Sequence, residues 1–121
     1  MTVMWSDHRE FAADWVSAWN AHDLERVLSH YEEDVVLTSP RIRLILGKDD
    51  GTIHGKSALR DYMGAALKKI PDLRFTLDRV FSGVNAVVLE VHATDGRHGA
   101  EFMEFGRNGL VSRVSATYAA G

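Results

Sequence analysis

Glu101 is the residue best placed to do chemistry in this sequence. In the predicted strand 100–105, Glu101 shares one face with Met103 and Phe105, because successive residues of a strand point to opposite faces. A carboxyl group among apolar neighbours has a raised pKa, since burial disfavours its charged form. Such a group can act as a general acid or base near neutral pH. The alternative is a position at a pocket rim, where Glu101 pairs with an arginine.

Other side chains could position a ligand beside Glu101. Trp15 and Trp19 share one face of a predicted helix, and aromatic residues at this spacing are usually core; we expect core packing for Trp19 and leave Trp15 open between core packing and ligand contact. Ser39 could donate a hydrogen bond or serve a turn before Pro40. The Tyr118 hydroxyl could orient a ligand, or the side chain could simply form part of the pocket wall. The predicted ligand-binding set is Trp15, Ser39, Met63, Leu89, Met103, Val114, Ala116 and Tyr118.

The sequence lacks the motifs of several other classes of site. With no cysteine, it has neither disulfides nor thiolate metal ligands. Its six histidines show no short metal-binding spacing, so we predict no metal site, and His92 is expected on the outer face of a sheet. No nucleophile elbow and no phosphate-binding glycine loop is present. We therefore expect no cofactor.

Length and charge limit the number of domains, the classes of partner and the cellular location that we expect. A chain of 121 residues predicts one domain over residues 1–121. The net charge of −3 and the scattered basic residues argue against a nucleic-acid surface, which needs clustered lysine and arginine. No apolar run approaches the roughly 20 residues of a membrane helix, and the first residues lack a signal-peptide pattern. We expect a cytoplasmic protein with no nucleic-acid and no membrane partner.

Hydrophobic periodicity predicts the elements that would hold these residues. Apolar residues at helical spacing predict three helices: one capped by Ser6, with Asp7 in its first turn, and continuing through Trp19; one from Asp23 to Tyr31; and one from Ser57 to Ile70. Alternating residues predict a strand at 35–38, a hairpin across Arg41–Ile53, and four strands within 73–81, 86–93, 100–105 and 110–118. Short glycine-containing turns between the later strands indicate an antiparallel meander. The expected fold is therefore α+β, with three helices packed on one face of a curved antiparallel sheet.

Four short motifs occur in the order and at the spacing of a known superfamily. They are W-N-A-H-D-L at 19–24, Y-E-E-D-V-V at 31–36, I-H-G-K-S-A-L-R-D-Y at 53–62 and F-x-x-x-G at 105–109. Together they resemble the nuclear-transport-factor-2-like (NTF2-like) superfamily, in particular its SnoaL-like branch. The resemblance implies a cone-shaped α+β barrel, or cystatin-like roll, whose helices and concave sheet face enclose an apolar pocket. It also implies a small hydrophobic ligand and a homodimer formed through the outer sheet face.

The ketosteroid isomerases of this superfamily provide a residue-by-residue comparison. Their base is an aspartate just before the proline that ends a strand, and this sequence has Ser39 there. Their oxyanion hole uses a tyrosine where Trp15 stands and a protonated aspartate where Glu101 stands. A serine hydroxyl takes up no proton near neutral pH without a base of its own. The comparison therefore argues against steroid isomerase activity.

Two classes of function follow from this resemblance. In the first, the pocket binds a small hydrophobic molecule and Glu101 performs acid–base chemistry of the isomerase or polyketide-cyclase type. In the second, the chain is a non-catalytic module that carries a ligand, dimerises or assists another protein. Fold alone does not decide between them, so the sequence leaves open whether the protein is an enzyme.

Overall fold

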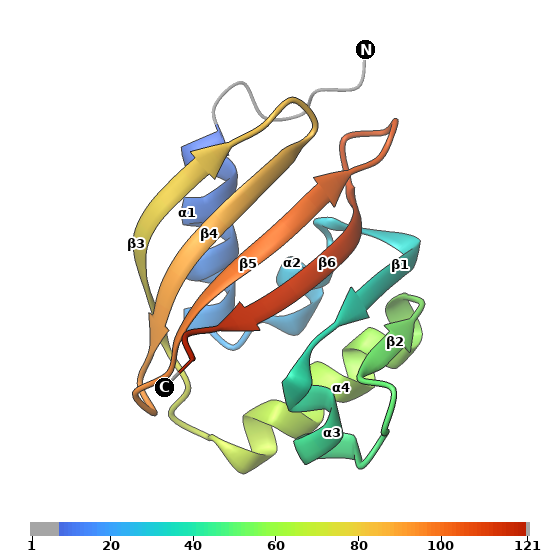
Figure 1. Cartoon of the computed structure of the whole chain (residues 1–121), viewed down its shortest axis with the longest axis vertical. Helices are drawn as coiled ribbons and strands as arrows, with labels where there is room; N and C mark the ends of the chain where they lie inside the picture. Colours follow the sequence, from blue (N-terminus) through green and yellow to red (C-terminus); the bar gives the residue numbers. More distant parts are fainter. Residues whose placement is uncertain (1–7, 121) are drawn as a thin grey trace.

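A six-stranded sheet carries helices on one face and presents its other face away from them (Figure 1). The computed structural model describes residues 8–120, so the predicted N-cap Ser6 and its neighbour Asp7 lie outside the described residues. The elements in chain order are α1 (His8–Asn20), α2 (Leu24–Leu28), β1 (Tyr31–Thr38), α3 (Pro40–Leu46), β2 (Thr52–His54), α4 (Lys56–Lys69), β3 (Phe75–Ser82), β4 (Ala86–Ala93), β5 (His98–Phe105) and β6 (Val111–Tyr118).

The sheet is curved and open, with strand order β2-β1-β6-β5-β4-β3. The neighbours β3 to β6 form the predicted antiparallel meander. Beside the meander, β1 runs parallel to β6, which departs from the expected purely antiparallel sheet. This pairing follows from the chain path, because α3, β2 and α4 separate β1 from the meander. The α+β class and the cone-shaped roll are confirmed.

Helix α1 forms because its apolar residues recur on one face. Phe11, Trp15, Ala18 and Trp19 are all buried, and this face lies against β3, behind the sheet in Figure 1. Asp23 caps α2 by accepting a hydrogen bond from the Arg26 amide at 3.2 Å. The second helix is shorter than predicted, because the chain becomes extended at Tyr31, where β1 begins.

The predicted hairpin across Arg41–Ile53 is wrong, because residues 40–46 form helix α3. Ser39 caps this helix by accepting a hydrogen bond from the Arg41 amide at 3.1 Å. Pro40 occupies the first turn, and Gly47 ends the helix with a φ of 71°. The described residues thus contain four helices rather than three, and β2 pairs with β1.

The core lies between α1, α4 and the inner sheet face. Its fully buried side chains include Phe11, Ile42, Leu59, Leu89 and Met103. Inner positions of β4 alternate with more exposed ones over the whole strand, as a sheet with one covered face requires. None of the helices within residues 8–120 has the length and apolarity needed to span a lipid bilayer.

Candidate functional site

A cavity of about 70 Å³ lies between the helices and the concave face of the sheet. Side chains from α1, α3 and α4 form one wall, and side chains from β1, β3, β5 and β6 form the other. Most of the lining is apolar, as in small-molecule sites generally. The lining residues are Trp15, Trp19, Tyr31, Leu37, Ser39, Arg41, Ile45, Leu59, Tyr62, Met63, Ala66, Ile70, Leu73, Phe75, Arg97, Glu101, Ala116 and Tyr118.

Glu101 projects into this cavity from the middle of β5. Its strand partners are Leu89 on β4 and Ala116 on β6, so apolar residues flank it on both sides. Burial raises the pKa of the Glu101 carboxyl to about 7, and the Arg97 charge only partly offsets this rise. Among the described residues, no side chain makes a hydrogen bond or ion pair with this carboxyl. Its unoccupied hydrogen-bonding capacity therefore faces the cavity.

Two tyrosines and Ser39 form a polar group near Glu101. Burial raises the pKa of Tyr62 to about 12 and that of Tyr118 above its usual range, and a hydrogen bond with Ser39 opposes both shifts. Both hydroxyls therefore stay protonated at neutral pH and can donate hydrogen bonds. Ser39 is 5% exposed, and its Oγ also accepts the α3 capping bond. The side chain predicted as either ligand donor or turn residue thus caps a helix and contacts two pocket tyrosines.

Arg41 and Arg97 bring positive charge to the same end of the cavity. Arg97 bonds Asp95 through Nε at 2.7 Å, and its guanidinium lies 5.4 Å from the centre of the Tyr118 ring. Both arginines help to lower the pKa of Asp95, and both oppose the rise in the Tyr118 pKa. This end of the cavity therefore favours ligand atoms that carry negative charge or accept hydrogen bonds.

The two tryptophans of α1 differ in what their ring N–H groups contact. Trp15 donates to the Tyr31 hydroxyl at 2.8 Å, so its N–H is used inside the protein. Trp19 is 7% exposed, and within residues 8–120 its Nε1 is buried without a hydrogen-bond partner. Buried donors are rarely left unpaired. The Trp19 N–H is therefore a group that a bound molecule could satisfy.

The structure brings most of the predicted site residues together. Trp15, Ser39, Met63, Glu101, Ala116 and Tyr118 all line the cavity. By contrast, Leu89, Met103 and Val114 do not line it, although their strands place them on the inner face. These three are at most 1% exposed and belong to the closed core, because the helices pack directly on that part of the sheet.

Six polar or aromatic lining residues are absent from the predicted site: Trp19, Tyr31, Arg41, Tyr62, Phe75 and Arg97. The helical spacing of Trp19 and Tyr62 predicts helix packing, which both residues also perform, and nothing in that spacing indicates a cavity. Arg41 was missed because the wrongly predicted hairpin did not place it on a helix that lines the cavity. Arg97 precedes β5, in a stretch whose sequence, Asp95-Gly96-Arg97, is typical of a turn. Its spacing of two residues from Gly99 and four from Glu101 is the available signal for the inner face.

Comparisons with known proteins agree with this architecture. A SnoaL-like protein of unknown function from Burkholderia thailandensis is 34% identical, with a TM-score of 0.90 over 99% of this chain and 100% of that one. A protein with a cystatin-like fold from Methylobium petroleophilum has a TM-score of 0.79 at 19% identity, over 100% of this chain and 81% of that one. An NTF2-like protein from Cytophaga hutchinsonii has a TM-score of 0.72 at 11% identity, over 98% and 93%.

The two more distant structures show the fold alone. No match was found among curated proteins. The SnoaL-like domain model matches residues 12–114, which run from within α1 to the middle of β6 and include almost all of the cavity lining. The chain belongs to the SnoaL-like family.

Proposed function

We propose that the cavity binds a small, mostly apolar molecule and that Glu101 exchanges a proton with it. The observation that carries this proposal is a carboxyl with a pKa of about 7 inside a largely apolar cavity. Near neutral pH both of its forms are populated, so one residue can take up a proton and return it. The hydroxyl donors Tyr62 and Tyr118 would orient the molecule.

This arrangement suits proton abstraction at a carbon beside a carbonyl group. The Glu101 carboxylate would take the proton, and negative charge would develop on the carbonyl oxygen. A tyrosine hydroxyl and the Arg41 and Arg97 charges would stabilise that oxygen, because fixed donors and cations act strongly in a site with little water. Returning the proton to another atom completes an isomerisation, whereas attack of the resulting carbanion on a second carbonyl is the bond-forming step of an aldol-type cyclisation.

The test is a thermal-shift screen of the purified protein against steroids, aromatic polyketides and terpenoids at several pH values. A ligand that binds the folded state at 100 times its Kd stabilises it by about 2.7 kcal/mol. We expect a hit whose shift changes with pH in the wild type and becomes pH-independent in Glu101→Gln. Glu104→Gln, from the opposite face of β5, is the matched control and should behave as wild type. The absence of any shift across these classes would contradict ligand binding.

A non-catalytic binding module is the second candidate, and the small cavity favours it. A volume of about 70 Å³ leaves little room for a substrate to change shape without movement of the wall. In this case a hit would stabilise wild type and Glu101→Gln equally at every pH. The same screen therefore distinguishes the two functions. Conversion of the bound compound to a product would show that the protein is an enzyme.

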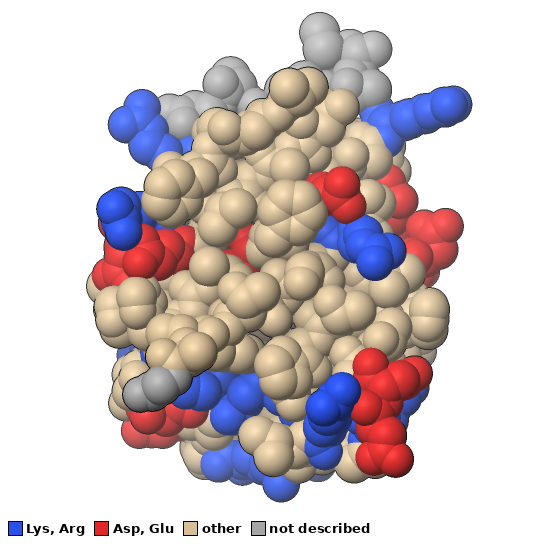
Figure 2. All heavy atoms as spheres, in the orientation of Figure 1, with Lys and Arg blue, Asp and Glu red and all other residues tan. Residues whose placement is uncertain are grey.

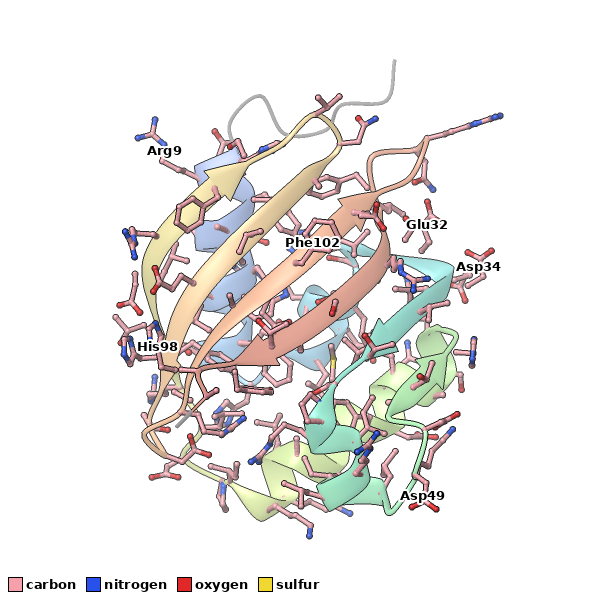
Figure 3. All side chains as sticks on the ribbon, in the orientation of Figure 1. Arg9, Glu32, Asp34, Asp49, His98 and Phe102 are labelled. Carbon is pink, nitrogen blue, oxygen red and sulfur yellow. The ribbon has the colours of Figure 1, made fainter. Side chains whose placement is uncertain are left out.

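We also propose that the outer sheet face forms a homodimer. Phe81 and Phe102 are 50% and 37% exposed, and uncharged side chains cover most of the middle of this face (Figure 2). Phe102 lies near its centre (Figure 3). Clustered exposed aromatics of this kind mark association surfaces.

Phe102→Asp is expected to convert the dimer to a monomer, because it would bury an unpaired charge at the interface. Light scattering coupled to gel filtration measures the mass. Val84→Asp is the control, because Val84 is 97% exposed in the turn between β3 and β4. A wild-type mass of about 13.5 kDa, that of one chain, would contradict the dimer.

A further inference from the structure

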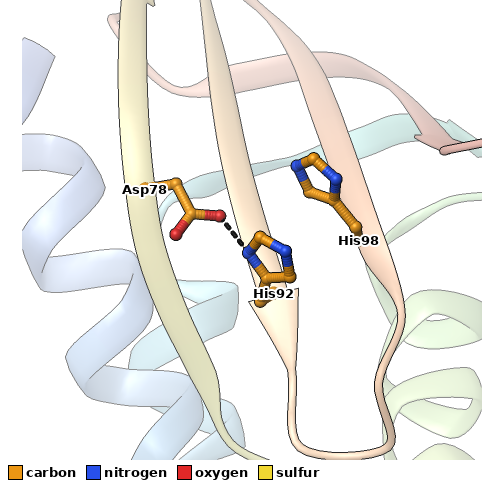
Figure 4. A group of neighbouring side chains, drawn as sticks. All are labelled: Asp78, His92 and His98. Atoms are coloured by element: carbon orange, nitrogen blue, oxygen red, sulfur yellow. Dashed lines mark hydrogen bonds and ion pairs between the residues drawn. The ribbon is translucent and has the colours of Figure 1, made fainter.

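We propose that Asp78, His92 and His98 form a site for a divalent transition-metal ion on the outer sheet face (Figure 4). Each residue offers one ligand atom, and these atoms lie within 4.8 Å of one another. Asp78 bonds the Nδ1 atom of His92. This cluster is separate from the cavity, because the inner residues of the same strands face the opposite side of the sheet.

The sheet itself brings the three side chains together. His92 and His98 are direct partners in the antiparallel pairing of β4 with β5, so their side chains project from one face. The next strand, β3, supplies Asp78 at a register irregularity between Leu77 and Arg79. Three adjacent strands thus hold the three ligand atoms close together on one face of the sheet.

The two imidazole rings stack with centroids 4.1 Å apart and an angle of 6° between their planes. This stacking holds two imidazole groups side by side on the outer sheet face. A neutral imidazole carries the nitrogen lone pair that binds metal ions. In a single chain the side chains of His92 and His98 are 51% and 39% exposed, so an ion from solvent can reach them before a second copy covers this face.

Glu90 supplies a supporting contact of the kind found around metal-binding histidines. Its carboxylate lies 2.7 Å from the Nε2 atom of His98 and also accepts a hydrogen bond from Arg79 at 2.7 Å. A carboxylate that holds one ring nitrogen fixes the tautomer, so that the other nitrogen is free to ligate. Asp78 and Glu90 bring two carboxylates to the cluster against the single guanidinium of Arg79, which favours a cation.

The donor set selects the kind of ion. Two imidazole nitrogens and one carboxylate suit zinc, copper, nickel or iron, whereas magnesium and calcium prefer oxygen ligands alone. Three protein ligands leave a coordination position for water, as in zinc sites with an open position. Zinc is therefore the appropriate probe, since it undergoes no redox change during a titration.

Isothermal titration of Zn²⁺ into the chelator-treated, untagged protein tests the site. We expect one ion per chain and no heat of binding for Mg²⁺ in the same buffer. His92→Ala should lose zinc binding, and Glu90→Gln should weaken it by about 10- to 100-fold, as for other residues that support a metal ligand. His54→Ala is the matched control, because His54 is an exposed histidine on β2, at the opposite edge of the sheet.

Circular dichroism confirms that each variant is folded, so loss of binding can be assigned to the site. Three results would overturn the proposal: no zinc binding by the wild type, equal binding by His92→Ala, or one ion per two chains. The last result would place the ion between two copies of the chain. None of these outcomes depends on activity in the cavity, so the metal site and the proposed function are tested independently of each other.

Discussion

Glu101→Gln is expected to remove a loss of stability that the wild type suffers as the pH rises from 5 to 8. Over this range, the free energy of unfolding of the wild type should fall by roughly 2–3 kcal/mol relative to the variant. The cause is the Glu101 pKa, which burial raises from 4.5 to about 7. The variant keeps the size of the side chain and removes its titration.

The sign follows from the number of protons bound in each state. Between pH 4.5 and 7 the folded protein keeps the Glu101 proton, whereas the unfolded chain has lost it. Stability falls with rising pH wherever the folded state binds more protons. The stabilising contribution is thus complete below pH 4.5, declines through this window, and is absent once the pH exceeds the folded-state pKa.

Urea denaturation of both proteins at pH 5 and pH 8 measures this difference. Comparison with the variant cancels the other titrating groups, including Asp14, Glu25 and Glu90, whose carboxyl pKa values are lowered by partners such as Arg26, Arg60 and Arg79. Glu104→Gln, on the opposite face of β5, is the control and should follow the wild type. An equal pH response of wild type and Glu101→Gln would show that the carboxyl is not held in an apolar environment, and the proposed acid–base role would lose its basis.

Hydrophobic periodicity was sufficient to predict the elements that are buried along one face over their whole length. Phe11, Trp15 and Trp19 recur at helical spacing and are all buried in α1. Val87, Leu89 and Val91 alternate along β4 and are all buried on the inner face. In both cases the apolar residues recur with the period at which side chains of that helix or strand return to its buried face. The position of Glu101 followed from the same alternation.

Alternation failed at residues 41–46, where it predicted a strand. Only Ile42 is buried in α3, whereas Leu44 is 70% exposed. The apolar residues of this segment therefore do not all face the core, and their alternation does not indicate a half-buried strand. Local signals predict the helix instead: Ser39 as N-cap, Pro40 in the first turn and Gly47 beyond the last turn. For a short surface helix these capping residues carry more information than hydrophobicity.

The cavity itself could not be predicted from strand alternation. The inner residues of β5 include both Glu101, which lines the cavity, and Met103, which is fully buried beneath the helices. Their difference depends on where α1, α3 and α4 stop covering the sheet. Likewise, His92 and His98 are separated by five residues in the sequence, and only the pairing of β4 with β5 makes them neighbours. Such groupings arise from tertiary packing, which no local spacing encodes.

Trp15→Ala is expected to destabilise the protein by about 3–5 kcal/mol. The ring is 2% exposed and packs against Trp19 and Phe75, with centroids 6.2 and 5.6 Å away. Its removal would open a void between α1 and β3 and would also leave the Tyr31 hydroxyl unpaired. Urea denaturation at one pH measures the loss. Leu44→Ala is the control and should change stability little, because Leu44 is exposed on α3.

A double-mutant cycle separates the hydrogen bond from the packing of the ring. Trp15→Phe removes the donor, and Tyr31→Phe removes the acceptor of the 2.8 Å bond; each should cost about 1–3 kcal/mol, because it leaves a buried polar partner unsatisfied. The double variant leaves neither group unpaired, so its cost should be smaller than the sum of the two single costs, apart from the void left by the smaller ring. Additive costs would mean that water satisfies both groups, and this wall of the cavity would then be hydrated rather than dry. A dry wall matters for Glu101 as well, since the same exclusion of water raises its pKa.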